Sequence, residues 1–223
     1  MSKPFKVCKD VYAVGGSDIS HPYDCCVYLL DAGDLVLIDA GAGTSFDKLV
    51  SNIEKLGFDP KNLKTILVTH AHIDHIGSLD RFQKDFGIQI IAHELDADAI
   101  EGRGGVAAEA YRVSYSPCRV DLRIKGSEEA LKIGKYELKI IHIPGHTPGS
   151  IAAYVDIDKQ RVLFGQDIHG PYYPEWGADP ALARLSLQKL IDLNSDILGE
   201  GHFGIYQPAS EVKRYIRQYL NSL

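Results

Sequence analysis

Residues 66–77, ILVTHAHIDHIG, restrict the fold more than any other segment, because they place three histidines and an aspartate within six residues behind an apolar run. Side chains alternate faces along an extended segment, so His70 and His72 point the same way. Asp74 and His75 follow where the chain turns into a helix, and they approach a neighbouring point from another direction. Imidazole and carboxylate are suitable ligands for Zn²⁺ and comparable divalent ions. The spacing therefore predicts a metal site at the end of a buried strand.

The four side chains cannot complete the coordination of two adjacent ions, because each ion needs about four ligands. Further ligands should come from the ends of other strands. Three candidates lie in glycine-containing turns that follow apolar runs: His146 in PGHTPGS, Asp167 in FGQD and His202 in GEGHFG. Loops of this kind meet at the rim of a sheet, so the separate segments agree on one site.

The order HxHxDH, PGHTPGS, a G-x-D turn after a strand and a late GH resembles the metallo-β-lactamase superfamily. The resemblance implies an α/β fold of the αβ/βα sandwich type, with two mixed β-sheets flanked by helices and the metals at one edge. It also implies two divalent metal ions, with Zn²⁺ preferred, although nitrogen and oxygen ligands also accept Fe²⁺ or Mn²⁺. The implied ligand set is His70, His72 and His146 for the first ion, Asp74, His75 and His202 for the second, and Asp167 between them.

The resemblance implies hydrolysis by a metal-bridging hydroxide, which Asp74 would orient and whose proton it would accept. One common subclass of zinc β-lactamases carries cysteine where Asp167 stands here. The aspartate resembles instead the hydroxyacylglutathione hydrolases (glyoxalase II), acyl-homoserine lactonases and related esterases. Because the chain ends 21 residues after His202, we expect no added C-terminal helical region for glutathione. The expected activity is hydrolysis of a small carboxylic ester, thioester or lactone.

Other functions stay open from the sequence. Persulfide dioxygenases are also similar to this chain and use one iron, held by two histidines and the bridging aspartate. Phosphodiester hydrolysis is a further alternative, because several members of this superfamily accept more than one substrate class. A metal-containing binding protein without turnover is a third alternative, which the intact ligand set disfavours.

The segment 165–177, GQDIHGPYYPEWG, follows Asp167 and should overhang the metals. Tyr172 and Tyr173 are candidates to donate a hydrogen bond to a developing oxyanion, with apolar anchoring of the loop as the alternative. The role of His169 is left open between the site and ordinary structure. Asp39, in LIDAG, is expected either to orient a ligand histidine or to form a turn.

The hydrophobic periodicity predicts strands in the first third of the chain and a helix after Gly43. A helix is expected from about residue 73 to 86, and another from about 180 to 193 with Leu182, Leu185 and Leu190 facing inward. No linker is apparent, so we expect one domain over residues 1–223. The irregular segment 102–119 is either a lid over the site or a passive surface excursion.

The charge balance of 30 acidic against 24 basic side chains disfavours a general nucleic-acid partner and leaves a small molecule as the expected one. The N-terminus has no apolar signal region and no stretch approaches the roughly 20 apolar residues of a membrane span, so we expect a cytoplasmic protein without a membrane partner. The C-terminal helix could pack on its own sheet or on another subunit, which leaves a homodimer open. The cysteines show no CxxC spacing and are expected to be reduced: Cys8, Cys25, Cys26 and Cys118.

Overall fold

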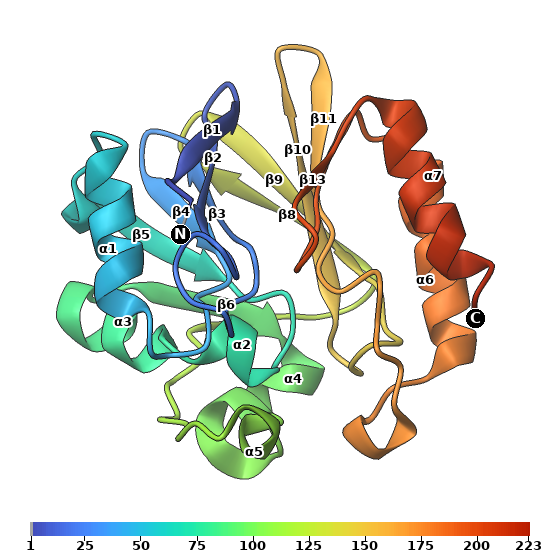
Figure 1. Ribbon diagram of the computed structural model, residues 1–223, viewed down its shortest axis with the longest axis horizontal. Helices are drawn as coiled ribbons and strands as arrows, with labels where there is room; N and C mark the ends of the chain where they lie inside the picture. Colours follow the sequence, from blue (N-terminus) through green and yellow to red (C-terminus); the bar gives the residue numbers. More distant parts are fainter. Residues whose placement is uncertain (1) are drawn as a thin grey trace.

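Two mixed β-sheets stack face to face in the computed structural model, which describes residues 2–223, and helices cover both outer faces (Figure 1). The strands of the first sheet follow the chain order: β1 (Phe5–Cys8), β2 (Val11–Gly15), β3 (Val27–Asp31), β4 (Leu35–Ile38), β5 (Leu63–Leu67), β6 (Gln89–His93) and β7 (Leu122–Ile124). Pairing in this sheet is antiparallel from β1 to β4 and parallel from β4 to β7.

The second sheet has the spatial order β13 (Ile205–Tyr206), β12 (Ile197–Gly199), β11 (Gln160–Phe164), β10 (Ile151–Ile157), β9 (Tyr136–His142) and β8 (Glu128–Ile133). Only the β11–β12 pair is parallel among the strand pairs of this sheet in residues 2–223. The α-helices are α1 (Phe46–Lys55), α2 (Ile73–Ile76), α3 (Leu79–Phe86), α4 (Glu94–Asp98), α5 (Ala108–Tyr111), α6 (Pro180–Asp192) and α7 (Ala209–Leu220). Short turns of other helix types occur at Pro60–Asn62, Ala99–Arg103 and Pro174–Trp176.

Three apolar layers hold the sandwich together, because the strands bury side chains on both faces. In β4, Leu35 and Leu37 face the layer under α1 and α3, whereas Val36 and Ile38 face the layer between the sheets. In β11, Leu163 faces the layer under α6 and α7. Strands buried on both faces read as continuous apolar runs, which is why these runs were visible in the sequence.

The helix expected over residues 73–86 is interrupted, and the interruption shapes the site. It divides into α2 and α3 at Gly77 and Ser78. The backbone of Ala42 passes so close to Gly77 that a Cβ atom there would overlap it, and the Gly77 amide donates to the Gly41 carbonyl at 2.8 Å. The short helix α2 is thus held separately, with Asp74 and His75 on it.

The inner face predicted for α6 is wrong for two of its three leucines. Leu182 is 41% exposed and Leu185 is 63% exposed, whereas Leu190 is buried as expected. The helix packs instead through a neighbouring stripe that includes Leu187 and Ile191. Leucines lie on both sides of this helix, so periodicity alone did not select the buried side.

Other boundaries also differ from the sequence analysis. Strand β5 ends at Leu67, so His70 lies on a loop and not at a strand end. Strands β1, β8 and β13 were not predicted; β8 alternates between exposed and half-buried residues and carries charges on its exposed side. The segment 102–119 contains the single turn of α5, with Ala107 and Arg112 in left-handed conformations on either side of it. No helix among residues 2–223 is long and apolar enough to cross a membrane.

The packing of α6 gives a direct test of this layer. Replacing buried Leu187 by alanine should lower the free energy of unfolding by about 2–5 kcal/mol, because the side chain leaves a cavity under the sheet. The matched change Leu185→Ala, on the exposed side, should stay within about 0.5 kcal/mol of the parent. Urea denaturation monitored by circular dichroism measures both values, and equal losses would contradict the orientation of α6.

Candidate metal centre

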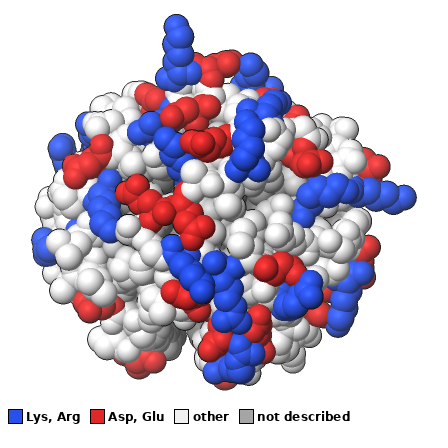
Figure 2. Space-filling model, turned by 180° about the vertical axis from the view of Figure 1, so that it is seen from behind, with Lys and Arg blue, Asp and Glu red and all other residues white. Residues whose placement is uncertain are grey.

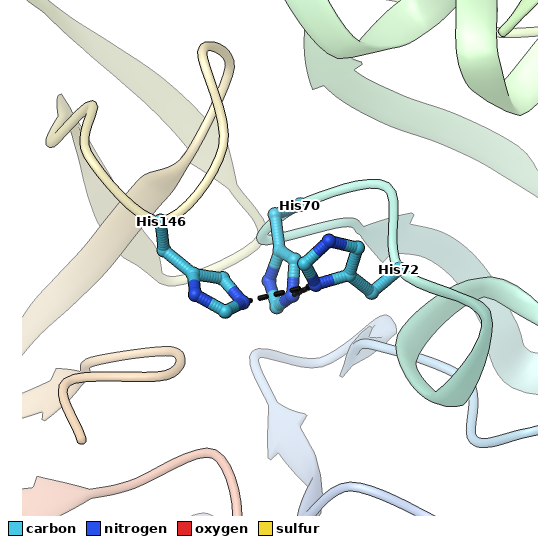
Figure 3. Close-up of side chains that lie close together, drawn as sticks. All are labelled: His70, His72 and His146. Atoms are coloured by element: carbon cyan, nitrogen blue, oxygen red, sulfur yellow. Dashed lines mark hydrogen bonds between the residues drawn. The ribbon is translucent and has the colours of Figure 1, made fainter. Parts of the chain in front are cut away.

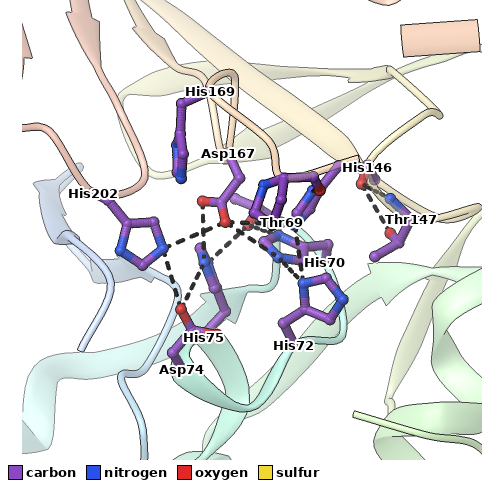
Figure 4. Close-up of polar contacts among 12 residues, drawn as sticks. Thr69, His70, His72, Asp74, His75, His146, Thr147, Asp167, His169 and His202 are labelled. Carbon is purple, nitrogen blue, oxygen red and sulfur yellow. Dashed lines mark hydrogen bonds and ion pairs between the residues drawn. The ribbon is translucent and has the colours of Figure 1, made fainter. Parts of the chain in front are cut away.

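The seven side chains predicted to bind metal converge at one edge of the two sheets (Figure 4). The loop after β5 carries His70 and His72, and α2 carries Asp74 and His75. The other three come from the second sheet, where His146 follows β9, Asp167 follows β11 and His202 follows β12. The loops and the short helix that carry them follow strands and meet at the same edge, although the segments are far apart in sequence.

The first group consists of His70, His72 and His146, all buried (Figure 3). His72 Nδ1 lies 3.1 Å from His70 Nε2 and 2.9 Å from His146 Nε2. Nitrogen atoms that share one tetrahedral Zn²⁺ at about 2.05 Å are roughly 3.3 Å apart. The three rings therefore present their nitrogens at nearly the spacing that one small cation requires.

The second group consists of Asp74, His75 and His202. Asp74 Oδ2 lies 3.1 Å from His202 Nε2 and 3.7 Å from His75 Nε2. This group mixes a carboxylate with two imidazoles, which is the donor set that Zn²⁺, Fe²⁺ and Mn²⁺ accept.

Asp167 lies between the two groups and is 4% exposed. Its Oδ1 is 3.3 Å from His75 Nε2 in the second group. Its Oδ2 is 3.4 Å from His146 Nε2 in the first group and 3.3 Å from His202 Nε2 in the second. One carboxylate therefore faces ligand atoms of both groups.

Two buried atoms at the middle of the cluster indicate that the residues fit cations. Among residues 2–223, neither His75 Nε2 nor Asp167 Oδ1 has a well-formed hydrogen bond. The two atoms lie 3.3 Å apart, so an imidazole nitrogen faces a carboxylate oxygen without a well-formed hydrogen bond, and a divalent ion would bind both atoms. The donor set and these two atoms together are consistent with two neighbouring metal sites.

Hydrogen bonds from outside the cluster aim the histidine rings. Asp39 Oδ2 lies 2.8 Å from His75 Nδ1, and both Asp39 oxygens also accept from Thr69 at 2.7 Å. A carboxylate can only accept here, so Nδ1 of His75 carries the proton and Nε2 faces Asp167. His146 is aimed in the same way, because its Nδ1 lies 3.0 Å from the Pro171 carbonyl. Of the two roles considered for Asp39 in the sequence analysis, this contact agrees with orientation of a ligand histidine.

Two further carboxylates tie the ligand loops together, and the sequence did not single them out. Asp96 accepts from the amides of Ala71 and Gly149 and from the Thr147 hydroxyl, each at 2.8 Å, and so joins the loops of the first group. Glu200 is fully buried; it accepts from the His202 and Phe203 amides. The partners of Asp96 are remote in sequence, and those of Glu200 are amides of the turn that follows it, so no residue pattern could have indicated these contacts.

A cavity of about 350 Å³ lies over the cluster, and only one of the three remaining candidates lines it. His169 lines it, with its Nδ1 3.0 Å from Glu200 Oε1. The Tyr172 hydroxyl donates to the Ile168 carbonyl at 2.9 Å, and Tyr173 is 48% exposed. Neither tyrosine lines the cavity. Tyr111, which the sequence analysis left unassigned, lines it and donates to Asp74 Oδ2 at 3.0 Å.

The two groups differ in protonation in the metal-free protein. Burial lowers the pKa of His70 and His72, and it lowers the pKa of His146 to about 3. For His202 burial acts in the same direction, but the carboxylates of Asp167 and Asp74 outweigh it and raise the pKa to about 10. The pKa of His75 is likewise raised by its acidic neighbours against the effect of burial. At neutral pH the first group is uncharged, whereas the second carries protons that a metal must displace.

A family model described as the metallo-beta-lactamase superfamily matches residues 22–202. Among curated proteins, a hydroxyacylglutathione hydrolase, GloC, of Haemophilus influenzae is 28% identical over 205 residues, which cover 89% of this chain and 93% of that protein. A probable metallo-hydrolase, YqgX, of Bacillus subtilis is 34% identical over 148 residues, which cover 65% of this chain and 66% of that protein.

Solved structures of β-lactamases have the same fold. The metallo-beta-lactamase GOB-18 of Elizabethkingia meningoseptica aligns with a TM-score of 0.79 and 26% identity, over 100% of this chain and 89% of that one. BJP-1, a subclass B3 metallo-beta-lactamase of Bradyrhizobium japonicum, aligns with a TM-score of 0.81 and 24% identity, over 99% and 92% of the two chains. The expected sandwich of two mixed sheets flanked by helices is confirmed.

The protonation difference predicts two kinds of metal uptake. Ion binding by Asp74, His75 and His202 should release at least one proton at pH 7.5, because His202 is protonated below a pKa of about 10. The apparent affinity of this group should therefore rise with pH up to about pH 10. Binding by the three first-group histidines should release none, because their pKa values lie below the usual 6.5. Calorimetric titration with Zn²⁺ in buffers of different ionisation enthalpy counts these protons.

The variant His202→Gln is the control for this titration. It removes the imidazole whose proton is displaced and leaves the first group complete. The number of protons released when an ion binds to the second group should then fall by about one. Equal release by both ions, or a release that this substitution does not change, would contradict the division into two groups.

Proposed function

Because the chain belongs to the metallo-β-lactamase superfamily of metal-dependent hydrolases, we propose that it hydrolyses a small carboxylic thioester, ester or lactone at a pair of divalent ions. The observation that carries the proposal is the position of Asp167. Its two oxygens face histidines of both groups at 3.3–3.4 Å, as expected for a carboxylate shared by two cations. Zn²⁺ is the metal we propose, with Fe²⁺ and Mn²⁺ as alternatives that the same donors accept.

The first ion is assigned to His70, His72 and His146, and the second to Asp74, His75 and His202, with Asp167 common to both. When bound, such a pair lowers the pKa of a shared water toward about 7 and polarises the substrate carbonyl. Asp74 is placed to orient that water and to take its proton, since its Oδ2 faces the cavity and accepts from Tyr111. Because burial lowers the pKa values of the first-group histidines, no protons compete with a metal ion for their nitrogens at pH 7.

Thioester hydrolysis stands first among the three bond types. The relative named hydroxyacylglutathione hydrolase is covered by this chain over 93% of its length, so the activity in its name needs no segment much beyond this span. This observation outweighs the expectation that a separate C-terminal region is needed for such a substrate. In the proposed reaction water adds to the carbonyl carbon, the C–S bond breaks, and a carboxylic acid and a thiol are released.

The segment 102–119 is proposed to act as a lid over the substrate. It carries Tyr111 into the cavity, where the hydroxyl contacts Asp74, and Ala107 also lines the cavity. Tyr111 is better placed than Tyr172 to contact a bound substrate, because Tyr111 lines the cavity and Tyr172 does not. A contribution of Tyr172 or Tyr173 to oxyanion binding stays a prediction.

The proposed partner is a small-molecule substrate. On the face shown in Figure 2, acidic and basic side chains are interspersed and do not form one continuous basic surface. That pattern supports a small substrate over a nucleic acid, whose binding would need clustered Lys and Arg. A cytoplasmic location, a single domain over residues 1–223 and a homodimer stay predictions.

Metal removal and ligand substitution test the proposal. Chelation should abolish hydrolysis of a hydroxyacyl thioester of glutathione, and Zn²⁺ should restore it. The variants His72→Ala and Asp167→Ala should each lose more than about a hundredfold in kcat/KM, since even outer partners of metal ligands contribute 10–100-fold. His21→Ala is the control, because His21 lies outside the cluster. Thiol release measured with a colorimetric reagent follows the reaction.

Three outcomes would contradict the proposal. The first is undiminished hydrolysis by both ligand variants. The second is oxygen consumption with glutathione persulfide by protein that contains one iron per chain and does not cleave thioesters, which would identify the mononuclear dioxygenase. Full metal occupancy with no turnover of thioesters, esters or lactones would favour a binding protein.

A further inference from the structure

A second cavity of about 330 Å³ lies beside the metal centre, where β1, β2 and β3 of the first sheet approach β13. A water molecule takes up about 30 Å³, and a methylene group is of similar size. The cavity therefore has room for roughly ten such groups. Its lining includes Phe5, Ala13, Ile19, Tyr28 and Ile205. Neither the metal ligands nor the proposed lid accounts for this cavity.

Two polar side chains of the lining, Tyr28 and Cys26, present apolar surface to the cavity. The Tyr28 hydroxyl donates to the Glu200 carbonyl at 2.8 Å, so the ring is what remains for the cavity. Burial raises the pKa of the Cys26 thiol to about 11, so this side chain is neutral and behaves as a small apolar group. The wall therefore offers apolar contact and little that would bind a charged ligand.

The side cavity adjoins the cavity over the metal centre. Both are lined by Ser17, His202 and Phe203. Phe203 is 57% exposed at this junction, next in sequence to a proposed metal ligand. An exposed aromatic side chain at the border of two adjoining cavities is typical of a ligand-binding surface. A substrate whose carbonyl lies at the metals can extend one substituent past Phe203.

We propose that this side cavity binds a linear apolar acyl chain of the substrate, and that the protein is selective for medium-chain acyl thioesters. This inference depends on the proposed thioester hydrolysis and specifies its substrate. The charge of the lining favours the acyl part of the thioester over its thiol part as the occupant of this cavity. No Lys or Arg occurs among the described residues that line the cavity, whereas Asp18 does. His202 also lines the cavity, but its imidazole is assigned to the second ion, so an anionic thiol such as glutathione would gain counter-charge only at the end next to the metal centre.

Binding and turnover of a chain-length series test the inference. Calorimetry should show that butyrate, hexanoate and octanoate bind with Kd values that decrease up to about fourfold per methylene, both in the metal-free and the Zn²⁺-loaded protein. The kcat/KM for the acetyl to octanoyl thioesters of N-acetylcysteamine should rise by a similar factor per methylene. The increase should stop where the cavity is full.

Two variants locate the effect in the side cavity. Phe5→Ala removes an outer wall at a residue that is 45% exposed, and Cys26→Leu narrows the interior. Each should reduce the octanoyl-to-acetyl ratio of kcat/KM by about tenfold or more, because the octanoyl chain loses contacts with several of its methylene groups. Leu185→Ala, at an exposed apolar residue of α6 on the outer side of the second sheet, is the control and should leave this ratio unchanged.

The outcomes separate the cavity from the reaction. If thioesters are hydrolysed but neither Kd nor kcat/KM depends on chain length, the acyl site is wrong and the hydrolase proposal stands. If Kd falls with chain length and Phe5→Ala removes the trend, but no thioester is cleaved, the acyl site stands and the proposed reaction fails. A trend that both cavity variants leave unchanged would place the acyl chain elsewhere and overturn the inference.

Discussion

The structure depends on one constraint, which is that several ionisable side chains are held together away from water. Burial of imidazole and carboxylate groups without partners is unfavourable, and two of the central atoms, His75 Nε2 and Asp167 Oδ1, have no well-formed hydrogen bond in the described chain. Divalent cations remove this cost, because each provides positive charge to the carboxylates and a bond to the ring nitrogens. The cluster is therefore a poor arrangement for a metal-free protein and a good one for a protein that binds two ions.

Small residues allow the loops to approach closely enough for that cluster. A Cβ atom at Gly201 would overlap the Asp167 carboxylate, and one at Gly77 would overlap the backbone of Ala42. The surrounding carboxylates then fix the loops in place, with Asp39 holding α2 and Asp96 joining the two histidine loops. The site is rigid because the polar groups next to the ligands are themselves hydrogen-bonded to backbone. In the proposed function, the cavities above and beside the metal centre select the substrate.

The sequence predicted the parts of this arrangement that local patterns encode. Apolar runs gave most of the strands, and histidines and aspartates in turns after those runs gave the residues that converge. Three features were not predictable for physical reasons. The buried side of α6 depends on which of two leucine stripes meets the sheet. The role of Asp96 depends on partners far away in the chain, and that of Glu200 depends on the conformation of the turn that follows it. Tyr111 reaches Asp74 from an irregular segment whose path no periodicity describes.

The central claim is that the seven residues hold two cations with Asp167 between them. Anomalous diffraction at the zinc absorption edge, from crystals of protein given two equivalents of Zn²⁺, tests it most directly. The account predicts two peaks, one beside His70, His72 and His146 and one beside Asp74, His75 and His202. A single peak, or zinc bound only away from these residues, would contradict it.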